Sequence, residues 1–256
     1  MLSFVDNGGV QLCLERRGNG PQHVLMLHGW ISARRMWYDV AARLDASRFT
    51  LHLLDFRGCG LSDRPLEGHD LQGYVSDARA ALASIDAPVI VAGHSMGGKV
   101  AQFLASEGPV NLDKLVLVAS GTAYERARSE RHRQTALEVY GRRARIEAFQ
   151  RAGMRAAIPP ESMQRIVEDA LLAQREHWIG WYDRGRFVDF RDRLPSISVP
   201  ALCIAGEQDP LIPAARARRE VAQQIAASLF VALRDAGHNL PVEKPDEVAG
   251  ALARFA

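Results

Sequence analysis

A serine flanked by glycines, set between an apolar run and a helical pattern, is the feature of this chain best suited to chemistry. Residues 89–92 are apolar and rich in β-branched side chains, 93–98 read Gly-His-Ser-Met-Gly-Gly, and 99–104 have a helical pattern. A strand-to-helix turn this tight strains the serine backbone and lifts the hydroxyl clear of the sheet. The turn also places Ser95 beside a helix N-terminus, where negative charge is favoured. The pattern therefore predicts a nucleophilic serine.

A serine hydroxyl is a weak nucleophile at neutral pH and needs a general base within hydrogen-bonding distance. Among eight histidines, His238 follows the last apolar run of the chain, at 228–233. This places it at the carboxyl edge of the sheet, where open parallel sheets hold ligands. His94 is next to Ser95 in sequence, but the turn directs its side chain away from the hydroxyl, so we interpret it as a packing residue. We predict that His238 is the base.

The base in turn needs an acid that fixes its tautomer and stabilises the imidazolium. Asp209 follows another apolar run, and the chain order Ser95, Asp209, His238 is the serine–acid–histidine order that accompanies such turns. Glu207 is the nearest competitor for this role, and Glu125 is a weaker one. Alternatively, Asp209 is only the N-cap of the next helix.

Acyl transfer puts negative charge on the carbonyl oxygen of the substrate, which normally accepts two backbone N–H groups in an oxyanion hole. We assign one N–H to Met96, directly after the nucleophile. We assign the other to Trp30 in His28-Gly29-Trp30, where the small Gly29 permits close approach. The alternative for Trp30 is an aromatic side chain that only packs.

Near-continuous apolar runs alternate with helical patterns along most of the chain, as expected of strands covered on both faces. The apolar runs are 24–27, 50–54, 89–92, 115–118, 201–205 and 228–233. The helical patterns are 36–44, 71–85, 95–105, 214–225 and 241–255. The alternation predicts an α/β fold with a mostly parallel central sheet and helices on both faces. Residues 4–17, broken by Asn7-Gly8-Gly9, predict an antiparallel hairpin at the start of the sheet.

The alternation stops between residues 122 and 194, where the pattern is helical and predicts no strand. Pro159-Pro160 breaks this stretch, and Glu161 begins a new helix. We predict a helical cap over 122–194, inserted into a core domain made of 1–121 and 195–256.

The predicted cap is rich in arginine and contains no lysine. We expect most of these arginines to lie on a solvated face in ion pairs, as Arg126 with Glu130 would. An arginine that points inward would instead bind a substrate carboxylate. Trp178, Trp181 and Tyr182 lie close together late in the cap. They are candidates for binding substrate, since such pockets are apolar and aromatic, but we favour the interpretation that they form the core of the cap.

The bulk composition excludes several classes of partner. Hydrophobic residues make up 47% of the 256 residues and charged residues 24%, and the net charge is +2. Such a balance gives no reason to expect nucleic-acid or membrane binding. Cys13, Cys59 and Cys203 are dispersed without metal-ligand spacing, which favours a reducing cytoplasm and predicts neither metal nor organic cofactor. We find no signal peptide and no transmembrane segment, and we expect a cytoplasmic monomer or homodimer.

Five elements occur together in a familiar order. They are His28-Gly29-Trp30, the 55–63 segment Asp-Phe-Arg-Gly-Cys-Gly-Leu-Ser-Asp, the 93–98 turn, Asp209 and Gly237-His238. With them the chain resembles, over nearly its whole length, the lid-bearing serine hydrolases of the α/β-hydrolase superfamily. The resemblance implies the α/β-hydrolase fold. In the 55–63 segment we expect Asp55 and Arg57 to pair or cap turns and Cys59 to be a packed thiol.

Relatives on this scaffold that open epoxides or displace halides carry aspartate at the position of Ser95, so a serine implies acyl transfer. We predict a carboxylic-ester hydrolase for small or medium esters or lactones. The turn is also similar to those of meta-cleavage-product hydrolases, which break carbon–carbon bonds. Further alternatives are a cofactor-free dioxygenase or perhydrolase and a ligand-binding receptor. Such dioxygenases more often carry a second histidine at the position of Met96, which counts against the dioxygenase hypothesis.

Overall fold

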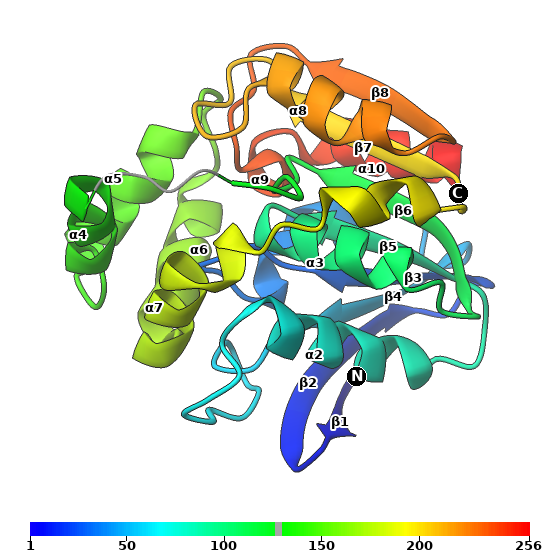
Figure 1. Ribbon diagram of the computed structural model, residues 1–256, viewed down its shortest axis with the longest axis horizontal. Coiled ribbons are helices and arrows are strands. Elements are labelled where there is room, and N and C mark those ends of the chain that lie inside the picture. Colours follow the sequence, from blue (N-terminus) through cyan, green and yellow to red (C-terminus); the bar gives the residue numbers. More distant parts are fainter. Residues whose placement is uncertain (126–129) are drawn as a thin grey trace.

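In the computed structural model, which describes residues 1–125 and 130–256, eight strands form one sheet in the order β1-β2-β4-β3-β5-β6-β7-β8 (Figure 1). The strands are β1 (Leu2–Asn7), β2 (Val10–Gly18), β3 (Gln22–Leu27), β4 (Phe49–Leu54), β5 (Val89–His94), β6 (Leu112–Val118), β7 (Ala201–Gly206) and β8 (Ser228–Leu233). The hairpin β1–β2 pairs antiparallel to β4, and the pairs from β4 to β8 are all parallel. The predicted α/β fold with a mostly parallel sheet is therefore confirmed.

Helices cover both faces of the sheet (Figure 1). Those of the core are α1 (Tyr38–Ala41), α2 (Leu71–Ala83), α3 (Met96–Ser106), α8 (Ala214–Glu220), α9 (Leu240–Glu243) and α10 (Pro245–Phe255). Short 3-10 turns are η1 (Arg34–Trp37), η2 (Gly185–Phe187), η3 (Arg191–Ser196) and η4 (Ala222–Gln224). Helices α2 and α3 pack on one face, and α1 and α10 pack on the other.

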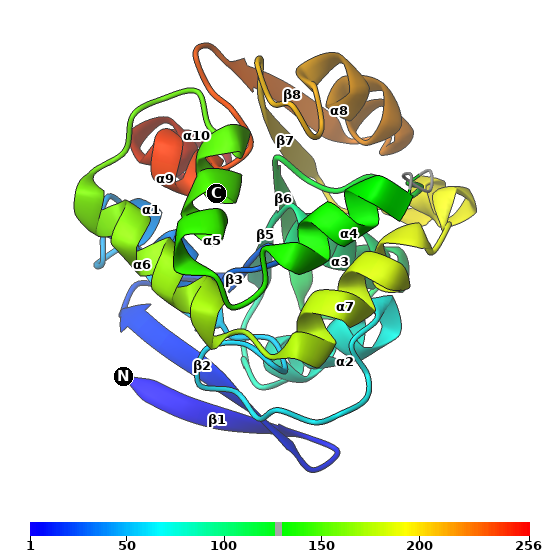
Figure 2. The same ribbon diagram turned by 90° about the vertical axis from the view of Figure 1, so that its left-hand side faces the viewer.

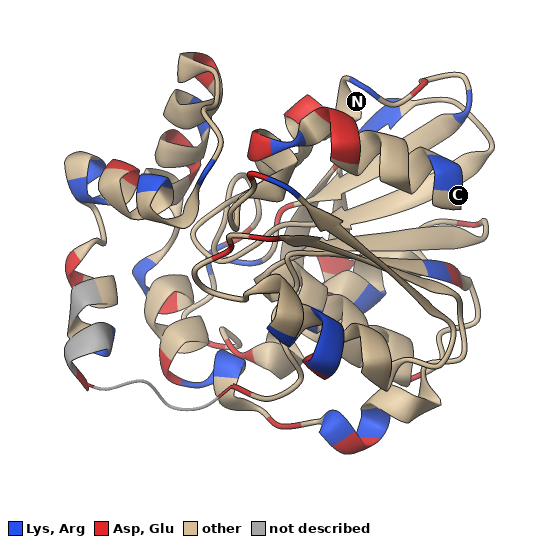
Figure 3. Ribbon diagram, turned by 90° about the horizontal axis from the view of Figure 1, so that it is seen from above, with Lys and Arg blue, Asp and Glu red and all other residues tan. Residues whose placement is uncertain are grey.

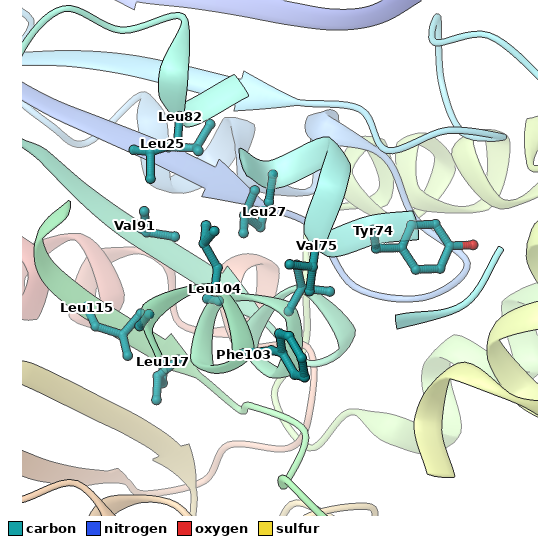
Figure 4. Close-up of a cluster of buried hydrophobic side chains, with 14 of the residues drawn as sticks. Leu25, Leu27, Tyr74, Val75, Leu82, Val91, Phe103, Leu104, Leu115 and Leu117 are labelled. Carbon is teal, nitrogen blue, oxygen red and sulfur yellow. The ribbon is translucent and has the colours of Figure 1, made fainter. Parts of the chain in front are cut away.

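The apolar strands are buried because helices cover them on both sides. Figure 4 shows one such cluster, in which Leu27 and Val91 of the sheet face Val75 of α2 and Leu104 of α3. All four are at most 1% exposed. This packing fixes the strands that lead into the site.

Three predicted helices are shorter or more broken than their patterns indicated. The helix predicted over 36–44 is η1 followed by the one-turn α1. The helix predicted over 214–225 is α8, which ends at Glu220. The 241–255 pattern is interrupted at Lys244, which has φ −137° and ψ 49°. Pro245 explains this break, because the proline ring disfavours helical geometry in the residue before it. Apolar periodicity alone did not reveal these interruptions.

Between β6 and β7 the described residues form four α-helices, which we call the helical insertion. They are α4 (Glu130–Glu138), α5 (Arg143–Gly153), α6 (Pro160–Leu172) and α7 (Arg175–Asp183). Figures 1 and 2 show them together at one end of the sheet. Helix α6 begins at Pro160, where proline's missing N–H costs nothing. The insertion has an apolar interior, which includes Ile146, Ile166 and Trp178 and continues onto Ile31, Met36 and Val242 of the core.

Charged residues lie mainly on the helices and loops (Figure 3), and strands β3, β4, β5, β7 and β8 contain none. In the insertion, Arg151 pairs with Glu147 at 2.8 Å and Arg133 with Asp183 at 2.7 Å, as expected for a solvated face. The predicted partner of Glu130, Arg126, lies outside the described residues. Within the described ranges, no helix combines the length and the apolar character needed to cross a bilayer.

Candidate active site

Ser95 occupies the sharp turn between β5 and α3. Its backbone has φ 51° and ψ −111°, a region that non-glycine residues enter only at a cost of about 1–3 kcal/mol. The turn is possible because Gly97 has no side chain: a Cβ there would lie 2.6 Å from the carbonyl oxygen of His28. The strain therefore depends on close backbone packing between β3 and the start of α3.

The structure brings together the three side chains predicted to act as nucleophile, base and acid. The Oγ of Ser95 lies 2.8 Å from Nε2 of His238, and Nδ1 of His238 lies 2.7 Å from Oδ2 of Asp209. Because the carboxylate only accepts, Nδ1 carries the proton and Nε2 accepts from the serine hydroxyl. Asp209 is 2% exposed and His238 7%. The Ser95 hydroxyl therefore faces the unprotonated ring nitrogen of His238, as a general base requires.

The second oxygen of Asp209 is also engaged. Oδ1 accepts the backbone N–H of Leu211 at 2.7 Å and that of Ile212 at 2.9 Å. These bonds fix the carboxylate plane toward His238. Asp209 is not the N-cap of α8, whose N-cap position is held by Pro213. Glu207 is exposed and Glu125 lies elsewhere in the site.

The loop that carries His238 is held by Glu243, a residue that the sequence analysis missed. Its carboxylate accepts the backbone N–H of Gly237 at 2.9 Å and of Asn239 at 2.8 Å. Glu243 lies four residues after Asn239, the N-cap of α9, one residue beyond the spacing of a capping box, so no standard cap signal marked it. Glu243 also accepts the backbone N–H groups of Arg155 at 2.7 Å and Ala156 at 3.1 Å in the insertion, so one carboxylate joins two segments of the site.

His94 does more than pack. Its Nε2 lies 2.9 Å from the carbonyl oxygen of His238 and must donate, since a carbonyl only accepts. Burial, and then the nearby His238, lowers the pKa of His94 to about 3, so this ring stays neutral. Its Nδ1 is buried against Gly29, where a Cβ would lie 2.8 Å away. Gly29 is thus required by the His94 ring.

The backbone N–H groups assigned to the oxyanion hole are available. Met96 is the first residue of α3, whose opening N–H groups have no partner within the helix. Neither the N–H of Met96 nor that of Trp30 donates to an acceptor in the described part of the chain. Trp30 lies on the wall of the same cavity as Ser95.

A cavity of about 200 Å³ opens over Ser95 and His238. Its walls come from the core and from the helical insertion, and most are apolar or aromatic. The lining side chains include Trp30, Ile31, Met36, Phe149, Trp181, Tyr182, Leu211 and Ile212. A cavity of this character suits a small apolar or weakly polar organic molecule.

The three aromatic residues proposed for substrate binding separate into two groups. Trp181 and Tyr182 line the cavity. Trp178 is not part of its wall: it is 1% exposed, donates from Nε1 to the Ala136 carbonyl at 2.9 Å, and packs inside the insertion. Successive positions on α7 point to different neighbours, and sequence could not assign those directions. Among the described arginines of 122–194, Arg186 lines the cavity, where it pairs with Glu125.

The 55–63 segment is structural, although its charged residues do not pair with each other. Asp55 binds Arg34 at 2.5 Å and also accepts the N–H of Leu61 at 2.9 Å. Arg57 pairs with Asp77 at 2.6 Å. Burial raises the pKa of Cys59 well above its usual value, consistent with a packed thiol. Over residues 1–125 and 130–256, no three His, Cys, Asp or Glu side chains gather as metal ligands.

The chain belongs to the alpha/beta hydrolase family, whose model matches residues 24–251. It is 27% identical to the AB hydrolase superfamily protein YisY of Bacillus subtilis (strain 168), over 96% of this chain and 95% of that protein. It is 28% identical to the pimeloyl-[acyl-carrier protein] methyl ester esterase of Pectobacterium carotovorum, over 94% of this chain and 97% of that one. An esterase structure from Exiguobacterium antarcticum superposes with a TM-score of 0.91 at 24% identity, covering 100% of this chain and 99% of that chain.

Proposed function

We propose that this protein is a serine hydrolase that cleaves a small or medium carboxylic ester or lactone through an acyl-serine intermediate. The observation that carries the proposal is the hydrogen-bonded series of Ser95, His238 and Asp209 at the floor of an apolar cavity. The full-length similarity to a methyl ester esterase supports the same reaction class. We further propose that residues 122–194 act as a cap over a core of 1–121 and 195–256.

In the proposed mechanism, His238 Nε2 takes the hydroxyl proton while Ser95 Oγ attacks the ester carbon. Asp209 stabilises the imidazolium that forms. The carbonyl oxygen becomes an oxyanion, which accepts the N–H groups of Met96 and Trp30. His238 then gives its proton to the leaving alcohol oxygen as the carbon–oxygen bond breaks.

The second half of the reaction reverses these roles. Water enters the site, His238 removes a proton from it, and the hydroxide oxygen attacks the acyl-serine carbon. Collapse of this second intermediate returns the proton to Ser95 Oγ and releases the carboxylic acid. No other reactant is needed, and each proton that His238 takes up is returned within the cycle.

The test is labelling by a fluorophosphonate, followed by turnover of p-nitrophenyl acetate and butyrate. We expect wild-type protein to be labelled at Ser95 and to hydrolyse the esters. Ser95→Ala should lose labelling and about 10⁴-fold or more of kcat. Ser196→Ala, at an exposed serine, is the matched control and should retain both. Full activity in Ser95→Ala would refute the proposal.

A further inference from the structure

One ion pair lies among the apolar walls of the cavity. Arg186, from η2 at the end of the helical insertion, meets Glu125, from the loop after β6. Their side chains are only 10% and 16% exposed. Nε of Arg186 donates to Oε2 of Glu125 at 3.1 Å, and Nη2 donates to the same oxygen. A buried pair inside a ligand cavity is costly to desolvate, so its presence calls for a reason.

The pair leaves hydrogen-bonding capacity unused. A guanidinium has five N–H groups, and those directed at Glu125 come from Nε and Nη2. Nη1 of Arg186 donates to no acceptor in the described residues. Nη1 is also not fully buried. It therefore retains accessible surface on a residue that lines the cavity.

Arg186 is held in place from two sides. Its guanidinium lies 4.8 Å from the centre of the Tyr182 ring. Its backbone carbonyl accepts from Nζ of Lys99 at 2.5 Å, and Lys99 also donates to Val188 at 2.9 Å. Lys99 is fully buried on the helix that begins beside Ser95, and burial lowers its pKa to about 8. The segment carrying Arg186 is thus attached directly to the nucleophile helix.

The ion pair also lies a short distance from the nucleophile. Gly121 donates its N–H to the carbonyl of Ser95 at 2.9 Å. A Cβ at Gly121 would lie 3.2 Å from that carbonyl oxygen and 3.8 Å from Oε1 of Glu125. Tyr182, beneath Arg186, is 5.3 Å from the Trp30 ring. Ser95, Glu125 and Arg186 line the same cavity of about 200 Å³, so one small substrate can contact all three.

We propose that Arg186 and Glu125 form a specificity subsite for a neutral hydrogen-bond acceptor, a keto or amide carbonyl, placed a short chain from the ester carbon. The free N–H groups of Arg186 would bind this carbonyl. A carboxylate at the same place would meet the repulsion of Glu125, so the subsite selects against anions. The inference deepens the proposed function and rests on it.

Three methyl esters of matched shape test the subsite. Methyl 4-oxopentanoate carries a keto group, methyl 4-methylpentanoate replaces it by an apolar branch, and monomethyl succinate replaces it by a carboxylate. We expect wild-type kcat/KM for the keto ester to exceed that for each of the others by about tenfold or more, as for a hydrogen bond to a charged donor. Equal values would overturn the inference.

Variants assign the preference to the pair. Arg186→Met, and the double variant Arg186→Met with Glu125→Gln, should bring the keto-to-apolar ratio close to one. Glu125→Gln alone keeps an acceptor for Arg186 but removes the repelling charge, so relative kcat/KM for monomethyl succinate should rise about tenfold. Arg191→Met, at an exposed arginine on the surface, is the matched control and should keep the wild-type ratios. If every Arg186 and Glu125 variant keeps the wild-type kcat/KM ratios among the three esters, other residues set the preference and the inference is overturned.

Ratios measured on one sample do not depend on the fraction of folded enzyme, so partial misfolding cannot mimic the result. If wild-type protein hydrolyses none of the three esters and Ser95 resists the fluorophosphonate, the proposed function fails. The subsite inference can then still be decided by measuring the binding of the same three esters to Ser95→Ala by NMR titration. Tighter binding of the keto ester supports the subsite, while equal or absent binding refutes it.

Discussion

The two halves of the candidate site are held in place by different forces. On the sheet side, Ser95 is fixed by backbone contacts so close that glycine is required, and Asp209 is fixed by two backbone N–H groups. On the insertion side, apolar packing against core residues such as Ile31 and Met36 is joined by ion pairs between long side chains. Asp169 of α6 binds Arg35 at 2.6 Å, and Arg165 binds Asp39 at 2.5 Å.

The difference indicates which property each half controls. Backbone packing tolerates little displacement, so the sheet side can hold reacting atoms in a hydrogen-bonded series. Ion pairs between long side chains permit small shifts and respond to pH and salt. We infer that the sheet side fixes the chemistry and the insertion sets which substrate fits.

The largest effect is expected on the sheet side. Asp209→Asn should lower kcat by about 10³–10⁴-fold, because the amide cannot hold His238 in the required tautomer. Its unfolding transition should change little, since Asn retains an oxygen for the N–H groups of Leu211 and Ile212. Glu207→Gln, two residues earlier and exposed, is the control and should keep wild-type kcat. Comparable losses in both variants would contradict the assignment of the acid.

A pair of glycine substitutions compares the packing of the two halves. Gly97→Ala places a Cβ 2.6 Å from the His28 carbonyl oxygen and should lower the free energy of unfolding by roughly 3 kcal/mol. Gly153→Ala, on the cavity wall at the end of α5, meets its nearest atoms at 3.8 and 3.9 Å, which is ordinary contact. It should be neutral or slightly stabilising. Urea denaturation measures both, and equal effects would remove the contrast.

The smallest expected effect is on the pH dependence of the free energy of unfolding, and it comes from Asp169 in the insertion. Burial raises the pKa of Asp169 to about 6, outweighing the attraction of Arg35. An acid with a raised folded-state pKa binds its proton more tightly in the folded chain. Its stabilising contribution is therefore complete below about pH 4 and is lost as the pH rises through about 6, by on the order of 3 kcal/mol.

Asp169→Asn should remove this component from the pH dependence of unfolding free energy, measured by denaturant titration between pH 4 and 7. Glu161→Gln, at an exposed carboxylate of the same helix, should leave the wild-type slope. An unchanged slope in Asp169→Asn would show that this carboxylate is not the titrating group.

Much of the scaffold could be predicted because it depends on local pattern. Continuous apolar runs gave the parallel strands, and the glycines around Ser95 gave the turn, since only small residues allow that approach. The helix interruption at Lys244 was visible in principle from Pro245. The contact of Glu243 with Arg155 and that of His94 with His238 were not predicted, because each joins segments that only the folded chain brings together.

The amino-acid sequence alone determined the fold class and the three residues that meet at the cavity floor, because strand order places their loops at one edge of the sheet. The tertiary structure decided which insertion side chains face that edge. Trp178 turns into the insertion, while Tyr182 and Arg186 turn toward the cavity. A helix of the insertion has neighbours on more than one side, and its apolar pattern does not say which neighbour each residue contacts.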